Sequence, residues 1–207
     1  MIYPDDERRE LHPYFPWGAS SLLDVGCSRG SFGRGLRSAG YLGRTLAVEP
    51  VSEAAAEARS HYDEVRCGFF PDVVKEDERF ECISFNDVLE HLVDPWTAVD
   101  RAYDLLAPGG HLLISVPNVR YWPVIKGLVF EGTWIYTDTG VLDRTHLRWF
   151  TRKSILELLS AKGRLDHLTI HPINEMPARR LTLIRPFARQ FVSDVCTRQY
   201  VGVATKS

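Results

Sequence analysis

Residues 22–33 read LLDVGCSRGSFG, in which an apolar run leads into a turn rich in glycine. Two leucines and a valine, stopped by Gly26, indicate a buried strand over residues 21–26. Residues 31–39 then favour a short helix that Gly40 ends. A strand, a glycine turn and a helix in this order predict a βα unit, and its turn is the first candidate for a ligand site.

The rest of the chain repeats this alternation of apolar runs and helical patterns. Strands are predicted over residues 45–50, 64–68, 80–87, 111–118, 167–173 and 198–206, and helices over 52–62, 95–107, 151–163 and 178–194. The alternation implies right-handed crossovers. We therefore expect an α/β fold, a Rossmann-like three-layer sandwich around a mostly parallel seven-stranded sheet. Residues 1–207 would form one domain, with an N-terminal extension over 1–19.

Residues 119–150 interrupt this rhythm after the fifth strand. The segment is rich in aromatic residues, with glycines and charges scattered between them. A long irregular segment inside a compact domain usually carries a function. We expect it to be an insertion that covers a site and binds the substrate.

Charge and composition narrow the classes of function. The formal net charge is −2, so there is no basic excess and nucleic acid is not an expected partner. No apolar run approaches the ~18 residues of a membrane span, and the acidic start does not resemble a signal peptide. The four cysteines form no C-x-x-C pair. We expect a protein of the reducing cytoplasm that does not associate with membranes.

The glycine turn itself admits three ligands. A phosphate loop would end in G-K-[ST], which is missing here. A dinucleotide site would read G-x-G-x-x-G, whereas Gly26, Gly30 and Gly33 are spaced four and three apart. The third ligand is a nucleoside that carries a charged amino-acid tail.

The same stretch resembles the first motif of the class I, seven-stranded S-adenosylmethionine-dependent methyltransferases. Asp24, Gly26 and Gly30 match that motif, and Ser28 replaces its middle glycine. The replacement requires Ser28 to adopt a backbone angle that glycine tolerates best. The resemblance implies that S-adenosylmethionine is the cofactor and that these four residues help to bind it.

Later segments resemble the family in the same order. Glu49 ends the second strand, where the family places the acid that binds ribose; the alternative is a solvated acid. Phe69 and Phe70 follow the third strand, where the family packs adenine; the alternative is plain core. SFNDVLEHL over 84–92 resembles the segment at the methionine end of the cofactor, and LLAPGGHLLISVPN over 105–118 the turn into the fifth strand. The resemblance implies three further cofactor residues: Asn86, Asp87 and Glu90.

The acceptor is predicted from the insertion. The segment after the fourth strand lacks the Asn/Asp-Pro-Pro-aromatic turn of many nucleobase methyltransferases, which disfavours methylation of bases. DRTHLRWFT resembles small bacterial methyltransferases of polysaccharide pathways, which implies a saccharide hydroxyl as acceptor. The aromatic and charged residues of the insertion could bind a sugar, or the aromatic residues could simply close the lid as a core. These residues are Tyr121, Trp122, Trp134, Tyr136, Asp138 and Arg144. The alternatives are a quinone-type phenol, a carboxylate, or a protein that binds the cofactor without catalysis.

An alcohol acceptor requires a base, and histidine titrates near neutrality. We expect His146 to be that base, with His91 as the alternative and Asp143 or Asp138 as the residue that orients it. A Mg²⁺ ion could be held by three acids, Asp87, Asp138 and Asp143. Exposed aromatic residues of the insertion would also suit a homodimer interface.

Overall fold

The computed structural model describes residues 6–160, 163, 165–177 and 189–207. Its seven-stranded sheet has the order β3-β2-β1-β4-β5-β7-β6. The strands are β1 (Ser21–Val25), β2 (Arg44–Glu49), β3 (Glu64–Cys67), β4 (Phe80–Asn86), β5 (Leu106–Pro117), β6 (Leu165–Glu175) and β7 (Thr197–Lys206). β7 runs antiparallel to β5 and β6, and the other neighbouring strands are parallel. The predicted α/β sandwich is confirmed.

β1 lies at the centre of the sheet. It pairs with β2 on one side and β4 on the other, so that Leu23 faces Leu46 and Ile83 across the two ladders. All three side chains are fully buried. This explains the unbroken apolar run in β1, because a central parallel strand is covered on both faces.

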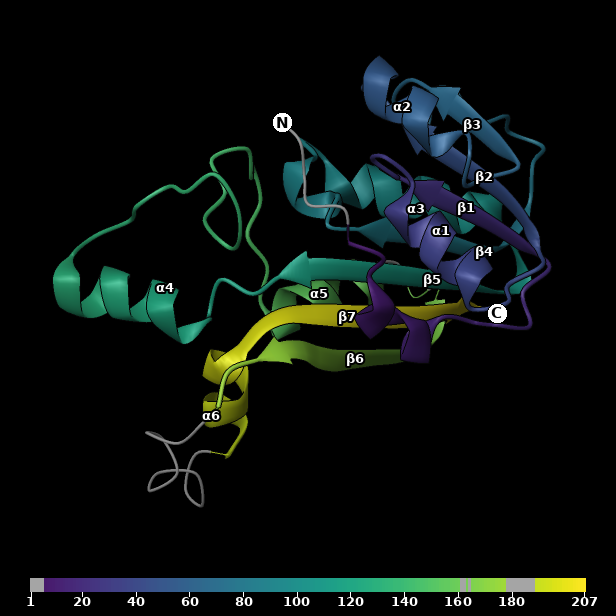
Figure 1. Cartoon of the computed structure of the whole chain (residues 1–207). Coiled ribbons are helices and arrows are strands. Elements are labelled where there is room, and N and C mark those ends of the chain that lie inside the picture. The colour runs from purple at the N-terminus through teal and green to yellow at the C-terminus, as the bar shows by residue number, and fades with distance from the viewer. Residues whose placement is uncertain (1–5, 161–162, 164, 178–188) are drawn as a thin grey trace.

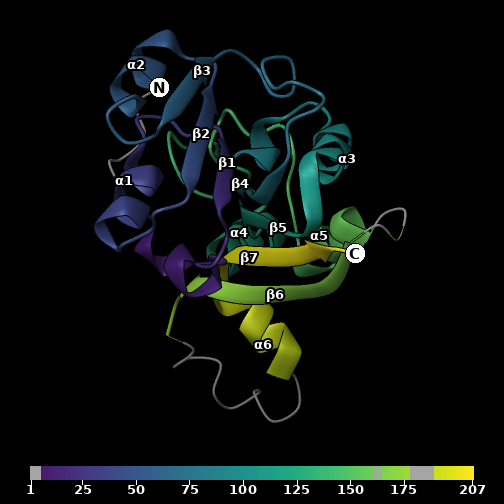
Figure 2. The ribbon, with the colours of Figure 1, turned by 90° about the vertical axis from the view of Figure 1, so that its right-hand side faces the viewer.

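Helices cover both faces of the sheet (Figures 1 and 2). α1 (Ser31–Ser38) and α2 (Ser52–Ala58) lie on one side, and α3 (Pro95–Leu105) and α5 (Arg152–Ser160) on the other. On the α1 side, Phe32 and Leu36 pack with Leu11 of the short 3₁₀ helix η1 (Arg9–Tyr14). On the opposite side, α3 begins at Pro95 behind Asp94, whose carboxylate accepts from the Thr97 N–H at 3.1 Å.

Several predicted boundaries differ from the structure. α3 ends at Leu105 and β5 begins at once, because Leu106 already pairs with Phe80. The register of this pair shifts before Cys82 meets His111, so the predicted turn at 108–110 is an irregularity within the strand. α2 ends at Ala58 instead of residue 62. Of the last predicted helix, residues 178–188 lie outside the described residues, and α6 spans Arg189–Cys196.

The insertion leaves the body of the molecule beyond β5. It forms α4 (Trp122–Lys126), which continues into the π-helix η3 (Gly127–Glu131), and then an irregular stretch up to residue 150. Figure 1 shows α4 projecting away from the sheet. Within the described part of the chain, no helix has the length and apolarity that a bilayer crossing requires.

Candidate active site

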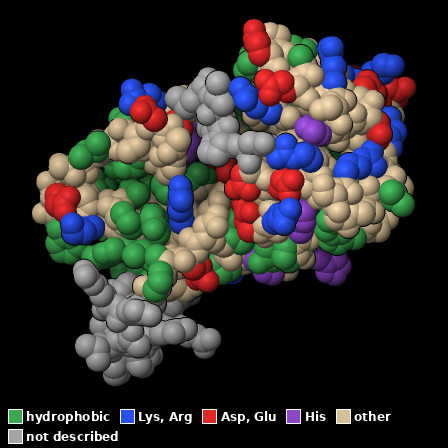
Figure 3. All heavy atoms as spheres, in the orientation of Figure 1, with side chains coloured by type: hydrophobic (Ala, Val, Ile, Leu, Met, Phe, Trp, Pro, Cys, Tyr) green, Lys and Arg blue, Asp and Glu red, His purple; other side chains and the backbone are tan. Residues whose placement is uncertain are grey.

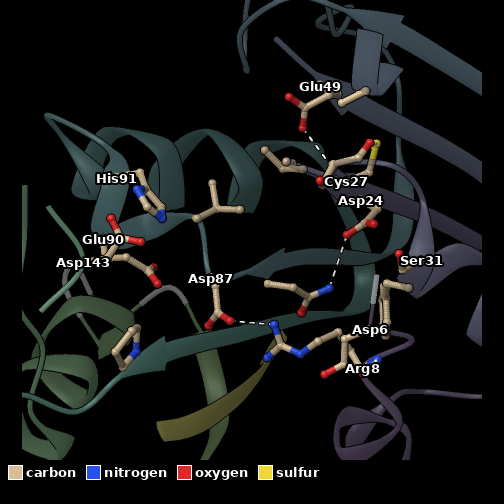
Figure 4. A pocket seen from close by; sticks show the side chains of 18 of the residues that line it. Asp6, Arg8, Asp24, Cys27, Ser31, Glu49, Asp87, Glu90, His91 and Asp143 are labelled. Atoms are coloured by element: carbon tan, nitrogen blue, oxygen red, sulfur yellow. Dashed lines mark hydrogen bonds and ion pairs between the residues drawn. The ribbon is translucent and has the colours of Figure 1, made fainter. Parts of the chain in front are cut away.

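A cavity of about 660 Å³ opens where β1, β2 and β4 end (Figure 4). In an open α/β sheet, ligands bind in the crevice outside the carboxyl ends of the strands. Most of the predicted cofactor residues line it: Asp24, Gly26, Ser28, Glu49, Phe69, Phe70, Asn86, Asp87 and Glu90. Gly30 is the N-cap residue of α1 and is not among the residues that line the cavity.

The glycine turn needs left-handed backbone angles at three places. Gly26 has φ 73° and Gly30 has φ 88°, both in the region that favours glycine. Ser28, the departure from the motif, adopts φ 49°. The unusual angle predicted for Ser28 is therefore confirmed. Its N–H donates to Glu49 at 2.9 Å, which helps to stabilise this conformation.

Glu49 ties the turn to the end of β2. One carboxylate oxygen accepts from the Ser28 N–H, and the other accepts from the Val51 N–H at 3.0 Å. The side chain is buried but lines the cavity. Each carboxylate oxygen can accept more than one hydrogen bond, so Glu49 has capacity left for ligand hydroxyls. The predicted role of Glu49, to accept hydrogen bonds from the ribose hydroxyls, is consistent with this geometry and stays a prediction.

Asp24 lies under the turn and is buried. Its Oδ1 accepts from Ser84 Oγ at 2.6 Å and from Asn86 Nδ2 at 3.4 Å, and its Oδ2 accepts from the Tyr62 hydroxyl. Burial raises the pKa of Asp24 to about 6, although hydrogen bonds from Ser84 and Tyr62 act against that rise. Asp24 therefore changes charge close to neutral pH.

The two predicted adenine residues differ in environment. Phe70 packs edge-on against Phe85 at 5.5 Å between ring centroids and is part of the core packing. Phe69 is 69% exposed and lies at the rim of the cavity. Phe69 thus offers a free ring face to a flat ligand, whereas Phe70 largely supports the wall.

Arg8 is a residue of the site that was not anticipated from the sequence. Arg8, from the N-terminal extension, reaches into the cavity and pairs with Asp87 at 2.6 Å (Figure 4). It also bonds Glu10 at 2.7 Å and Ser115 at 3.2 Å. Burial lowers the pKa of Arg8, but the charges of Asp87 and Glu10 outweigh it and the net shift is upward. A run of mixed charges before the first strand gave no sign that one of them enters the site.

The far end of the cavity holds the predicted catalytic residues. His146 and His91 meet edge-on, with ring centroids 4.8 Å apart, and Glu90 Oε1 lies 4.0 Å from His146 Nε2. His146 and Glu90 are buried, and both Glu90 carboxylate oxygens have no hydrogen-bond partner among the described residues. Burial, followed by the charge of Asp87, raises the pKa of Glu90 well above its usual range. Burial and the neighbouring His91 lower the pKa of His146.

The carboxylates of the predicted orienting acids do not hydrogen-bond the His146 ring, although the His146 backbone N–H donates to the Asp143 carbonyl at 3.0 Å. The Nδ1 atom of His146 lies 3.1 Å from the Val141 carbonyl oxygen. A carbonyl oxygen can only accept a hydrogen bond, so Nδ1 carries the proton. Asp143 lines the cavity, but its Oδ1 accepts from the Thr145 N–H at 2.8 Å and the Thr145 hydroxyl at 2.7 Å. Asp138 is exposed and pairs with Arg144 at 2.7 Å. A backbone carbonyl therefore replaces the predicted carboxylate.

The three acids suggested for Mg²⁺ do not form a common site. Asp87 is held by Arg8, Asp138 by Arg144 and Asp143 by Thr145. Three other residues, Glu90, His91 and His146, have potential metal-ligand atoms that lie within 4.8 Å of one another. If this protein holds a cation, that set has the closer geometry.

The predicted acceptor residues lie outside the lining of the cavity. Trp122 packs near α6 and against Phe130, and Trp134 meets Trp149 edge-on at 5.7 Å. Tyr136 and Arg144 instead line a smaller, open hollow beside the cavity, completed by His146, Leu147 and Trp149. His146 lines both spaces. It therefore lies in the wall that the cavity and the hollow share.

Comparisons with known proteins agree on the family. A family profile described as "Methyltransferase domain" matches residues 4–163. The ubiquinone biosynthesis O-methyltransferase of Alkalilimnicola ehrlichii is 30% identical over 173 residues, which cover 74% of this chain and 66% of that protein. The mitochondrial enzyme of the same name from Bos taurus is 30% identical over 130 residues, covering 58% of this chain and 34% of that protein. This chain thus spans between a third and two thirds of these relatives.

A solved structure shows the same fold. It is a SAM-dependent methyltransferase from Archaeoglobus fulgidus, with a TM-score of 0.73 at 16% sequence identity, and the match covers 96% of this chain and 92% of that one. At this identity the likeness establishes the fold.

Proposed function

The chain belongs to the methyltransferase-domain family, and on that premise we propose that it methylates a hydroxyl group of a small acceptor, with His146 as the general base. The cofactor is S-adenosylmethionine, which supplies an electrophilic methyl group on a positively charged sulfur when bound. The observation that carries the proposal is the position of His146 between the cofactor cavity and the neighbouring hollow.

The cavity residues fit this cofactor. The left-handed turn at Gly26 and Gly30 brings the backbone close to a ligand, and Glu49 keeps capacity for ribose hydroxyls. Phe69 presents a ring face at the rim. Carboxylates outnumber cations around the cavity, which suits a cofactor that carries positive charge.

His146 has the properties that a base requires. The Val141 carbonyl fixes the proton on Nδ1, so the lone pair that accepts a proton is on Nε2. Its lowered pKa keeps the ring neutral at pH 7. In the proposed step, the acceptor oxygen forms a bond to the methyl carbon as the carbon–sulfur bond breaks, and its proton moves to Nε2.

For the acceptor, we favour a phenolic hydroxyl over the saccharide predicted from the sequence. The two relatives named above are ubiquinone biosynthesis O-methyltransferases, and neither is named as a sugar enzyme. The hollow beside His146 is built from Tyr136, Leu147 and Trp149 with one cation, Arg144. An apolar hollow of this kind suits a flat ring. The cytoplasmic setting and the homodimer stay predictions.

A second candidate role for the same histidine comes from the cluster with Glu90 and His91. A divalent cation held there would lower the pKa of the acceptor hydroxyl, and His146 would be a ligand instead of a base. The two roles compete for the same Nε2 lone pair, so they make opposite predictions about chelators.

The test is a methyl-transfer assay with labelled S-adenosylmethionine and two sets of acceptors, catechols and methyl glycosides, each with and without EDTA. We expect catechol methylation that persists in EDTA. Methylation of glycosides alone would overturn the phenolic acceptor, and activity lost in EDTA and restored by Mg²⁺ would overturn the role of base. Binding of S-adenosylhomocysteine without turnover of either set would identify a non-catalytic protein.

A further inference from the structure

Tyr62 is a buried residue beside the cofactor cavity that the proposed reaction does not use. It follows α2 in the sequence and packs with Cys27, Ala47 and Ala58 between that helix and the sheet. Its hydroxyl donates to Asp24 Oδ2 at the end of β1 and accepts from the Gly33 N–H at 2.9 Å. One oxygen atom therefore joins the strand to the first turn of α1, on both sides of the glycine turn.

This contact explains the third glycine of LLDVGCSRGSFG. A Cβ atom at Gly33 would lie 2.4 Å from Cζ of Tyr62, which is closer than real atoms approach. Gly33 is needed because an aromatic ring lies against this turn of the helix. Gly30 is confined by the same segment, since its Cβ would lie 3.0 Å from Cα of Ala58. The second and third glycines of the turn are thus required by close contact with the end of α2 and with Tyr62 beyond it.

We infer that Tyr62 is a positioning residue for cofactor binding, which acts through Asp24 by holding its carboxylate in the ionised form against the glycine turn. The inference rests on the proposed cofactor site and names a residue that controls it. Tyr62 itself does not line the cavity, whereas Asp24 does. Its effect on a ligand must therefore pass through Asp24 and the turn.

The charged, titratable and hydroxyl groups around Asp24 come from five parts of the chain. Glu49 on β2 raises its pKa and Arg8 of the N-terminal segment lowers it. Cys27 in the turn is buried and its pKa lies far above neutrality, so it stays neutral. The two hydrogen-bonding hydroxyls, Ser84 on β4 and Tyr62, both favour the ionised carboxylate. Removing the Tyr62 hydroxyl should therefore shift protonation of Asp24 to higher pH.

The experiment measures S-adenosylmethionine affinity by calorimetry between pH 5 and 8.5, without acceptor, in the full chain and in Tyr62→Phe. We expect affinity of the unchanged protein to rise with pH through about 6, the pKa of Asp24. In Tyr62→Phe the rise should move to higher pH, with affinity about tenfold weaker at pH 7 and the gap narrowing at pH 8.5. In the double variant Asp24→Asn/Tyr62→Phe, affinity should equal that of Asp24→Asn alone.

Tyr41→Phe is the matched control. Tyr41 is equally buried, and its hydroxyl has no hydrogen-bond partner among the described residues. Its affinity profile should match that of the unchanged protein. Gly33→Ala is a second variant, because the added methyl group must push the Tyr62 ring aside. It should weaken S-adenosylmethionine binding as Tyr62→Phe does. Alanine has a higher helix propensity than glycine, so a loss of affinity in this variant would not come from a weaker helix.

The outcomes separate the two proposals. If the unchanged protein does not bind S-adenosylmethionine, the proposed function fails. If it binds, and Tyr62→Phe binds equally well or is weaker by one constant factor at every pH, the positioning role is overturned and Tyr62 is only a packing residue.

Discussion

The glycine turn and the insertion border the same cavity but differ in how they are built. Around the turn, buried polar groups of Asp24, Glu49 and Tyr62 are satisfied by one another and by partners from β4, α1 and the turn itself. The insertion instead exposes large apolar side chains, such as Leu128, Val129 and Phe130 at 52%, 65% and 70% (Figure 3). Specific hydrogen bonds thus tie the first region together, whereas the second presents exposed apolar surface.

This difference indicates which region should control binding of the cofactor and which should control binding of the acceptor. A satisfied buried polar network is costly to disturb, because each lost partner leaves a desolvated group behind. Exposed aromatic residues contribute mainly contact area. Changes near the turn should therefore act on cofactor binding, and changes in the insertion on the acceptor. His146 is the exception that tests the comparison, since it belongs to the insertion but is buried in the cavity wall.

The largest effect is expected at His146. His146→Ala should lower turnover by about 10²–10⁴-fold, the usual contribution of a positioned base, and leave S-adenosylhomocysteine affinity within about twofold. Steady-state assays and calorimetry measure the two. His167→Ala, an exposed histidine on β6, is the control and should keep full activity. Normal turnover in His146→Ala would remove this residue from the mechanism.

Glu49→Gln should weaken cofactor affinity by about 10–100-fold, because the amide nitrogen cannot accept from one of the two N–H donors, Ser28 and Val51, and the bond that remains loses its charge assistance. Turnover at saturating cofactor should change little. The control is Glu53→Gln, an exposed acid at the start of α2. An unchanged dissociation constant would show that Glu49 plays no part in binding.

The next effect in size is the fall of the turnover rate at low pH, which should be about tenfold for each pH unit below the pKa of His146. The base must be neutral, and burial lowers the pKa of His146 below the ordinary 6.5. Activity at saturating substrates should therefore be level at pH 7 and fall about tenfold per unit only below the lowered pKa. A rate profile measured from pH 5 to 8 checks this, and a midpoint above 7 would point to another base.

The smallest effect is expected in the hollow. Trp149→Ala should raise the KM of a phenolic acceptor by about 2–10-fold, which corresponds to the loss of one aromatic contact, without changing cofactor affinity. Trp17→Ala, an exposed tryptophan in the N-terminal segment, is the control. A large loss of cofactor affinity in Trp149→Ala would contradict the division between the two regions.

Local sequence was sufficient where one strand and its turn create the feature. The buried run in β1 follows from short-range rules, the left-handed angle at Ser28 was inferred because Ser28 stands where the family motif has glycine, and the structure confirms both. Boundaries were predicted less well where distant pairing decides them. Leu106 joins β5 because it meets Phe80 across the sheet, although Pro108 and Gly109 read locally as a turn.

Contacts across long separations could not be predicted from the pattern of residues. Arg8 lies 79 positions before Asp87, and nothing near either residue indicates the pair. The orienting partner of His146 was expected to be an acid because acids lie nearby in the sequence. The actual partner is the carbonyl of Val141, which every residue carries and no motif can reveal.

The sequence by itself determined the βα alternation and the glycine turn, since these depend on periodicity and on glycine at a tight turn, and its resemblance to a known family indicated the class of cofactor. Only the tertiary structure decided that Tyr62 binds Asp24 and that His146 separates two spaces. The physical reason is that periodicity and turn geometry are properties of neighbouring residues. Hydrogen-bond partners and burial arise only when segments far apart in the chain pack together.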